Sequence, residues 1–264
     1  ICITLRTQGL AIVLNKIYGA AINAAYGIGS QISGMVSFIS SSFNNAIAPQ
    51  LMAAEGGGDR KKMHALAEIQ SKTSFLLLAM IGIPTMFEMQ ILLEMWLVDV
   101  PNYTMLFGRV FLAMQIVDML STGLGSANRA IGNIGLYTII TFTPKLFVLP
   151  IAWLILKNEG SLISVGIIMF AVEAICMLLR IFLFRNESWF NAWRYCKSVI
   201  LRPLVPVLIS STTCYIVQVL IISDIRILYT YILSITVFLF TSYKITLNRN
   251  ERRVVKSIVK KIFK

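Results

Sequence analysis

Ionisable side chains inside long apolar stretches are the residues of this chain that could do chemistry. Three of them are basic, Lys16, Arg109 and Lys145, and two are acidic, Asp118 and Glu173. A charge at the centre of a bilayer costs about 2.5–3.5 kcal/mol on insertion scales, so such residues indicate a functional site. If the three basic side chains share one aqueous cavity, they would attract an anion such as pyrophosphate, because Arg offers a bidentate fork and Lys a point charge.

The same charges have two other interpretations. Lys16 with Asp118, or Lys145 with Glu173, could form structural ion pairs between helices. Alternatively, Asp118 and Glu173 could be the proton or cation sites of a coupled transporter, because carboxylates at membrane depth mark ion pathways. The residue types alone leave these alternatives open.

Further polar residues lie in or beside the apolar stretches. Asn15 and Asn23 belong to the first two stretches and are expected to line a wet cavity, because amides that face lipid would be costly. Arg180 lies near the end of its stretch, where its long side chain can reach the headgroup region. Glu88 and Glu94 are expected at the interface for the same reason.

The elements that position these residues are expected to be membrane-spanning helices. Of the residues, 57% are hydrophobic and 14% are charged, with a mean hydropathy of +0.76, which excludes an ordinary soluble protein and a disordered one. About eight stretches reach the roughly 20 apolar residues that a spanning helix needs. They lie near 8–24, 27–52, 73–97, 103–127, 134–157, 161–184, 203–222 and 226–246. The runs lack the alternation of a membrane barrel, so we predict an all-α polytopic helical bundle.

Basic residues predict the orientation of the bundle. Lys and Arg number 24 against 12 Asp and Glu, a formal net charge of +12. They gather in every second link: 53–72, around Arg129, 185–202, and the tail after 244. The positive-inside rule then places both termini in the cytoplasm, and Arg6 agrees with a cytoplasmic start. Topology thus accounts for the charge, so nucleic-acid binding is not expected.

The predicted spans divide the chain into four parts. Residues 1–184 form a six-helix transmembrane lobe, and 185–202 form an amphipathic linker that lies in the interface of the phospholipid bilayer. Residues 203–246 form two additional transmembrane helices, and 247–264 form a basic cytoplasmic tail. The chain begins with Ile1, so we interpret it as the later part of a longer protein.

Signatures of catalysis and of metal binding are missing from the sequence. It contains no nucleophile elbow, zinc-protease motif or phosphate-binding loop, and the glycines at 56–58 have the wrong spacing for the last of these. The four cysteines form no C-x-x-C pair, and His64 is the single histidine. A membrane-embedded enzyme would need a large loop or a deep polar pocket, and the outer links are short. We therefore predict no catalytic residues, no metal and no cofactor, and a protein that is not an enzyme.

Three segments resemble one family of membrane proteins. Residues 23–63 contain NAAYGI after a first span, AIAPQ at the end of the next, and a glycine-rich basic loop. Together with 87–104 and 123–137, they resemble bacterial polysaccharide exporters. These are the O-antigen-type, lipid-linked oligosaccharide flippases of the multidrug/oligosaccharidyl-lipid/polysaccharide exporter superfamily, which is MATE-like. The resemblance covers about residues 8–185.

This resemblance implies a fold and a function. Members have two six-helix lobes followed by two further helices, so the chain resembles the second lobe of such a transporter. It implies alternating access around a cationic cavity, which moves an undecaprenyl-pyrophosphate-linked sugar across the bacterial inner membrane for polysaccharide or O-antigen biosynthesis. Implied partners are the lipid-linked oligosaccharide and glycan-assembly membrane proteins. The alternative is a MATE-type drug/cation antiporter of the same superfamily, in which Asp118 and Glu173 would matter more than the basic groups.

Overall fold

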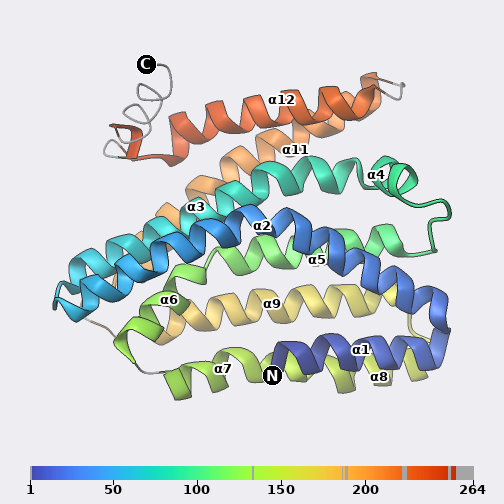
Figure 1. Cartoon of the computed structure of the whole chain (residues 1–264), viewed down its shortest axis with the longest axis horizontal. Helices are drawn as coiled ribbons and strands as arrows, with labels where there is room; N and C mark the ends of the chain where they lie inside the picture. The colour runs from blue at the N-terminus through green and yellow to red at the C-terminus, as the bar shows by residue number, and fades with distance from the viewer. Residues whose placement is uncertain are drawn as a thin grey trace.

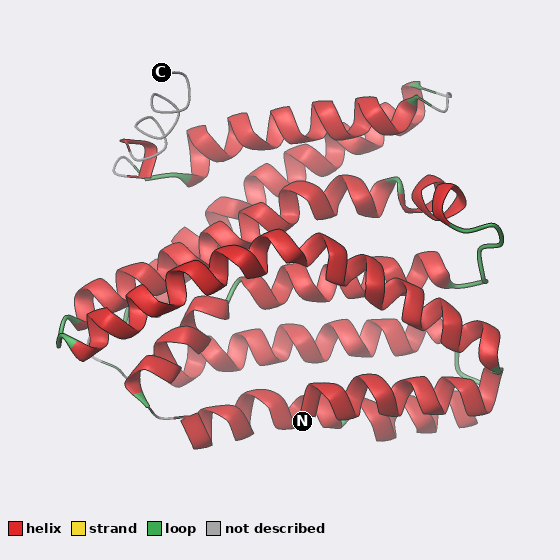
Figure 2. Ribbon diagram, viewed as in Figure 1, coloured by secondary structure: helices red, strands yellow, loops and turns green. Residues whose placement is uncertain are grey.

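The computed structural model describes residues 2–132, 134–185, 187, 190–221, 225–248 and 251–253. Throughout this described part, every regular element is a helix (Figure 2), which confirms the predicted all-α class. In chain order the helices are α1 (Cys2–Tyr18), α2 (Ala20–Gly56), α3 (Arg60–Phe87), α4 (Met89–Trp96), α5 (Thr104–Met119), α6 (Thr122–Ile131), α7 (Ile134–Leu146), α8 (Val148–Lys157), α9 (Leu162–Phe184), α10 (Ala192–Tyr195), η1 (Cys196–Leu201), α11 (Arg202–Leu220), α12 (Arg226–Thr241) and η2 (Ser242–Thr246).

Five helical segments of the described chain are long and apolar enough to cross a membrane. They are Arg60–Phe87, Ile134–Lys157, Leu162–Phe184, Ala192–Leu220 and Arg226–Thr246. Helices α5 and α6 make a sixth if they are taken as one span broken by a 48° bend. The structure therefore supports a multi-pass membrane protein, but not the predicted count of eight spans. The first two predicted spans correspond to α1, which has only 17 residues, and to α2, whose many Ser and Asn residues lower its hydropathy.

The helices lie side by side in an elongated bundle (Figure 1). Helix α2 packs on α3 and α5, and α5 packs on α9. Helices α1, α7 and α8 form one edge of the bundle, and α11 and α12 form the opposite edge, where they pack against each other and on α3. The pocket that forms the candidate site lies among α5, α6, α7 and α9. Helix α3 lies between this pocket and α12.

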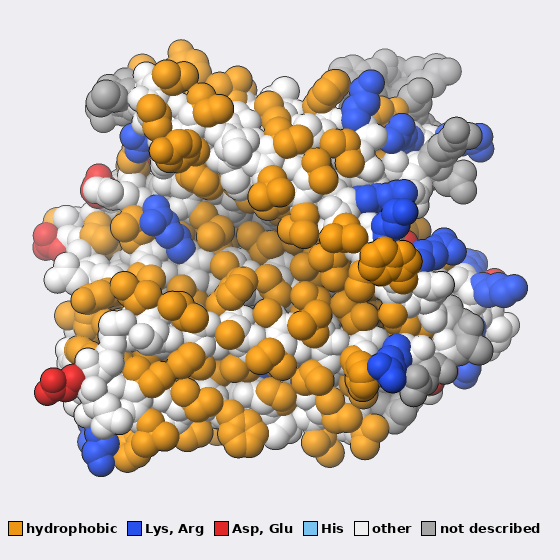
Figure 3. All heavy atoms as spheres, turned by 180° about the vertical axis from the view of Figure 1, so that it is seen from behind, with side chains coloured by type: hydrophobic (Ala, Val, Ile, Leu, Met, Phe, Trp, Pro, Cys, Tyr) orange, Lys and Arg blue, Asp and Glu red, His pale blue; other side chains and the backbone are white. Residues whose placement is uncertain are grey.

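Charge and apolar surface are separated along the bundle. The face in Figure 3 is hydrophobic over a broad central band, whereas most of its Lys and Arg side chains lie near the right-hand edge. Large apolar side chains such as Ile167, Leu208 and Phe240 are exposed. Extended apolar surface of this kind marks a membrane interaction. The first residues of α1 lie near the middle of the bundle's long axis rather than at either end (Figure 1).

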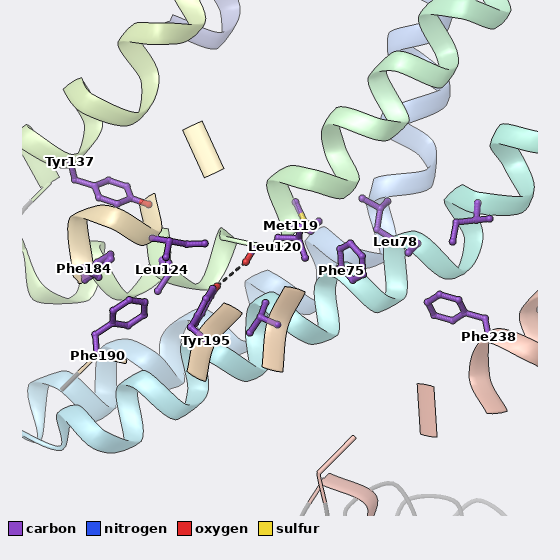
Figure 4. Packing of buried hydrophobic residues seen from close by; sticks show 14 of the residues in the cluster. Phe75, Leu78, Met119, Leu120, Leu124, Tyr137, Phe184, Phe190, Tyr195 and Phe238 are labelled. Carbon is purple, nitrogen blue, oxygen red and sulfur yellow. Dashed lines mark hydrogen bonds between the residues drawn. The ribbon is translucent and has the colours of Figure 1, made fainter. Parts of the chain in front are cut away.

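The segment predicted as an interfacial linker is partly built into the helical bundle. Residues 192–201 continue into α11, so that Ala192–Leu220 is one helical segment. Tyr195 is fully buried, and its hydroxyl donates to the Leu120 carbonyl oxygen at 2.8 Å (Figure 4). The same hydroxyl lies 2.8 Å from the Ser71 Oγ. Its ring packs beside Phe190 in the core that α3, α6 and α9 share. These polar anchors draw the segment into the bundle, while the part of the predicted basic tail from 254 to 264 lies outside the described residues.

Candidate functional site

The candidate site is built around the break between α5 and α6. Gly123 lies so close to α3 that an added Cβ would come within 1.9 Å of the Ala67 carbonyl oxygen. The Gly123 amide donates to Ser71 Oγ at 2.8 Å, and the Tyr195 hydroxyl lies beside the Leu120 carbonyl. These groups replace helical hydrogen bonds that the break removes. Such replacement is needed because backbone polar groups inside a membrane must find partners within the protein. Helix α6 therefore begins inside the bundle.

A carboxylate on α9 joins two buried cations. Glu173 accepts from Arg6 Nη1 at 3.1 Å and pairs closely with Lys145 Nζ. The side chains of Glu173 and Lys145 are each 4% exposed, and that of Arg6 is 8% exposed. The alternative prediction of a Lys145–Glu173 ion pair is thus confirmed. Arg6, which we expected as an exposed charge at a cytoplasmic start, is instead buried, because it pairs with Glu173 in the interior.

A second carboxylate continues this network toward the helix break. Asp118 Oδ1 accepts from Arg180 Nη1 at 2.7 Å and lies 3.9 Å from Lys145 Nζ. Arg180 also donates to Ser121 Oγ at 3.0 Å. The expectation that Arg180 reaches toward the headgroups is therefore wrong, since two acceptors at the break turn it inward. Asp118 pairs with these two cations and not with Lys16.

A pocket of about 160 Å³ opens onto this network. Its lining residues are Ile3, Asp118, Thr122, Gly125, Arg129, Tyr137, Phe142, Lys145 and Arg180. Three basic side chains and one carboxylate give this lining a formal net charge of +2. The first turn of α6 borders the pocket at Thr122, and the N-terminus of a helix adds positive potential. An anion is the ligand that this arrangement favours.

Two buried polar groups of the pocket have no hydrogen-bond partner among the described residues. They are the Tyr137 hydroxyl and the Arg180 Nε, on residues that are 8% and 5% exposed. A buried donor or acceptor left unsatisfied costs about 1–3 kcal/mol, so such groups need an explanation. Gly125 leaves room beside the Tyr137 hydroxyl, because an added Cβ would lie 3.3 Å from its oxygen. Both groups can donate to a ligand with oxygen atoms.

The structure does not bring the other predicted cavity residues to this pocket. Lys16 and Asn15 are exposed in the last turn of α1, and Asn23 is half-buried in the first turn of α2. Arg109 Nε donates at 2.9 Å to the Met86 carbonyl, which the end of α3 leaves without a helical partner. Of the three basic residues that the sequence singled out, only Lys145 lines the pocket.

Sequence reasoning missed Arg129, Tyr137 and Arg180 as site residues. A signal for Arg180 was present, because it follows Glu173 by seven residues and therefore shares its helix face. Arg129 was interpreted as a loop charge, yet it lies in the last turn of α6, where its Nη2 donates to Ser126 Oγ at 2.9 Å. No residue spacing marked Tyr137, because its hydroxyl reaches the pocket from another helix.

Two further buried charges lie away from the pocket. Glu88 was expected at the interface, but it is buried and accepts from Arg226 Nη2 at 3.0 Å and Thr230 Oγ1 at 2.8 Å. Lys72 was expected in a cytoplasmic link, but it is buried in α3 and pairs with Glu251. Both pairs tie α3 to α12 or to the chain that follows it. Glu94 is exposed, as expected.

Comparison with known proteins adds no relative. No protein-family model matches the chain, and no curated protein or solved structure matches it either. Among the described residues, no group of three or more His, Cys, Asp or Glu side chains could hold a metal ion. The pocket and its charges are therefore the basis for a functional assignment.

Proposed function

We propose that this chain is part of a membrane transporter that moves an anionic, lipid-linked oligosaccharide across a bacterial inner membrane by alternating access. In this proposal the pocket among α5, α6, α7 and α9 receives phosphate oxygens of the pyrophosphate link. The observation that carries it is a pocket of net positive charge at a broken helix, with two unpartnered buried donors. Transporters commonly bind anionic substrate groups at the N-termini of broken helices. The resemblance to polysaccharide exporters supports the same class.

Each charged residue has a distinct part in this proposal. Arg180 offers its guanidinium, and Lys145 offers a point charge, to the phosphate oxygens. Asp118 already accepts from Arg180, so an entering anion competes with it. Glu173 positions Lys145 and Arg6 without lining the pocket itself. A volume of about 160 Å³ admits a phosphate group but no oligosaccharide, so the sugar would occupy space outside this pocket.

The drug/cation antiporter is the less favoured alternative. A cation would need a carboxylate whose charge is not already compensated. Asp118 and Glu173 are each paired with two basic side chains. The net charge of the pocket would therefore repel the cation that such an antiporter carries.

Binding of inorganic pyrophosphate to the purified chain tests the proposal. Arg129 is exposed and forms its hydrogen bond with the neutral Ser126 Oγ, so Arg129→Gln removes a pocket charge without leaving a buried charge unpaired. We expect this variant to weaken pyrophosphate binding about tenfold, because a hydrogen bond to a charged group contributes about 1.5 kcal/mol or more. Lys16→Gln is the matched control and should leave binding unchanged. Equal losses in both variants, or tighter binding of a cationic drug than of pyrophosphate, would refute the proposal.

Export in cells tests the substrate. In a strain whose surface glycan depends on this protein, Arg129→Gln should lower the amount of surface glycan at unchanged protein level. Lys16→Gln should export normally. If Arg129→Gln exports normally although its pyrophosphate binding is lost in vitro, the pocket is not needed for transport of a lipid-linked glycan.

A further inference from the structure

A second cavity lies on the surface of the bundle, between the C-terminal half of α9 and the start of the next helical segment. It has a volume of about 420 Å³ and shares no residue with the cationic pocket. Its lining is Ile175, Leu178, Leu179, Ile181, Phe182, Arg185, Ala192 and Cys196. All of these side chains except Arg185 are apolar or weakly polar. The groove therefore suits a hydrocarbon chain with one charged group at its end.

Arg185 places a positive charge at one end of the groove. It directly follows α9, it is exposed, and its guanidinium lies over the Phe182 ring, 4.4 Å from the ring centroid. This stacking holds the charge beside the apolar wall that Phe182 forms. An anionic group attached to a hydrocarbon chain would meet the charge and the wall together.

The surroundings of Arg185 are those of a membrane interface. Arg194 and Lys197 are exposed on the neighbouring segment. Trp193, which follows Ala192 of the groove in the sequence, is 72% exposed. Trp and basic residues are enriched at the level of lipid headgroups. On the face in Figure 3, the basic side chains gather toward one end of the apolar band. Because Arg185 directly follows α9, the groove extends from this charge along the C-terminal half of that helix.

We propose that this groove binds an anionic phospholipid, with one acyl chain along α9 and the phosphate at Arg185. Basic pockets between membrane helices bind anionic headgroups, because the charges attract and the acyl chain is buried at the same time. A zwitterionic phospholipid of equal chain length fills the same groove but gains less from Arg185. The site is independent of the transport proposal, since it contains none of the same residues.

Native mass spectrometry of the full chain, released from detergent with added lipid, tests the site. The probes are phosphatidylglycerol and phosphatidylcholine with identical acyl chains. A basic residue near an anionic headgroup contributes about 1 kcal/mol, so we expect about fivefold greater retention of phosphatidylglycerol. Arg185→Gln should abolish this preference while phosphatidylcholine retention stays the same. Lys197 is another exposed basic residue and lies outside the lining, so Lys197→Gln is the control and should keep the preference.

A second variant tests the hydrocarbon part of the site. Ala192→Trp fills the groove and should reduce retention of both lipids at least fivefold, with pyrophosphate binding unchanged as a check on folding. Equal retention of the two lipids by the unmodified chain would overturn the proposal. Equal effects of Lys197→Gln and Arg185→Gln would also overturn it, because they would show a diffuse charge effect. A dimer that Ala192→Trp converts to a monomer would show that a second copy of the chain occupies the groove instead.

Discussion

The buried carboxylate of Glu173 offers the sharpest test of the charge network. Replacing it with Gln keeps the shape of the side chain but removes the charge that faces Arg6 and Lys145. Both cations are almost completely buried, and Arg6 has no other ion-pair partner among the described residues. Removing one partner of a buried pair costs about 3–5 kcal/mol, because it leaves an uncompensated charge in the interior. We expect Glu173→Gln to lower the free energy of unfolding by about that amount.

Denaturant-induced unfolding in detergent micelles, followed by circular dichroism, measures this change. Glu94→Gln is the matched control, because Glu94 is exposed and its substitution should change the free energy by about 0.5 kcal/mol or less. The double variant Arg6→Met/Glu173→Gln should recover part of the loss, since it removes one of the two stranded cations. If Glu173→Gln unfolds within about 1 kcal/mol of the unmodified chain, the network is not a closed set of buried pairs and the reasoning fails.

Three other perturbations have defined outcomes. Asp118→Asn removes the carboxylate that competes for Arg180, so pyrophosphate should bind about tenfold more tightly in a titration; unchanged or weaker binding would contradict the competition. Gly123→Ala should destabilise the protein by about 3 kcal/mol or more, because the new methyl group would overlap backbone of α3, whereas Gly34→Ala meets open space and should be neutral or slightly stabilising; similar unfolding of the two would refute the close approach. Glu88→Gln should speed hydrogen exchange in the first turns of α12, because the Arg226 guanidinium loses its charged partner; unchanged exchange there would show that the ion pair does not hold the helix.

The all-helical fold class followed from hydropathy, whereas the predicted count of eight spans did not hold, since five or six helical segments are long and apolar enough to cross a membrane. Apolar runs of about 20 residues located the helical segments, because backbone groups in lipid must be satisfied within each helix. The break at Leu120 and Ser121 has only a weak local signal, a serine at the N-cap position of α6 followed by Gly123. It depends on Ser71 and Tyr195, which are distant in the sequence and supply hydrogen bonds at the break. Local composition carries no information about such partners.

The candidate site was predictable only in part, for a related reason. The sequence identified Lys145, Asp118 and Glu173 because they lie deep within apolar runs. It misplaced Arg6 and Arg180, because nearness to the end of a run suggests contact with headgroups. In the structure their acceptors lie on other helices, and these draw both guanidinium groups inward. Depth in an apolar run indicates burial, but pairing across helices determines where a charge points.

The pairing of Lys72 with Glu251 has a practical consequence for shortening or tagging the protein. Glu251 lies five residues after the last turn of η2, in a stretch that looks dispensable because it is polar and lies beyond the final apolar helix. A truncation before this position would leave the ammonium group of Lys72 buried without its counter-charge, at a cost comparable to that of a damaging core mutation. Affinity tags and protease cleavage sites at the C-terminal end of the chain are therefore best placed after residue 253.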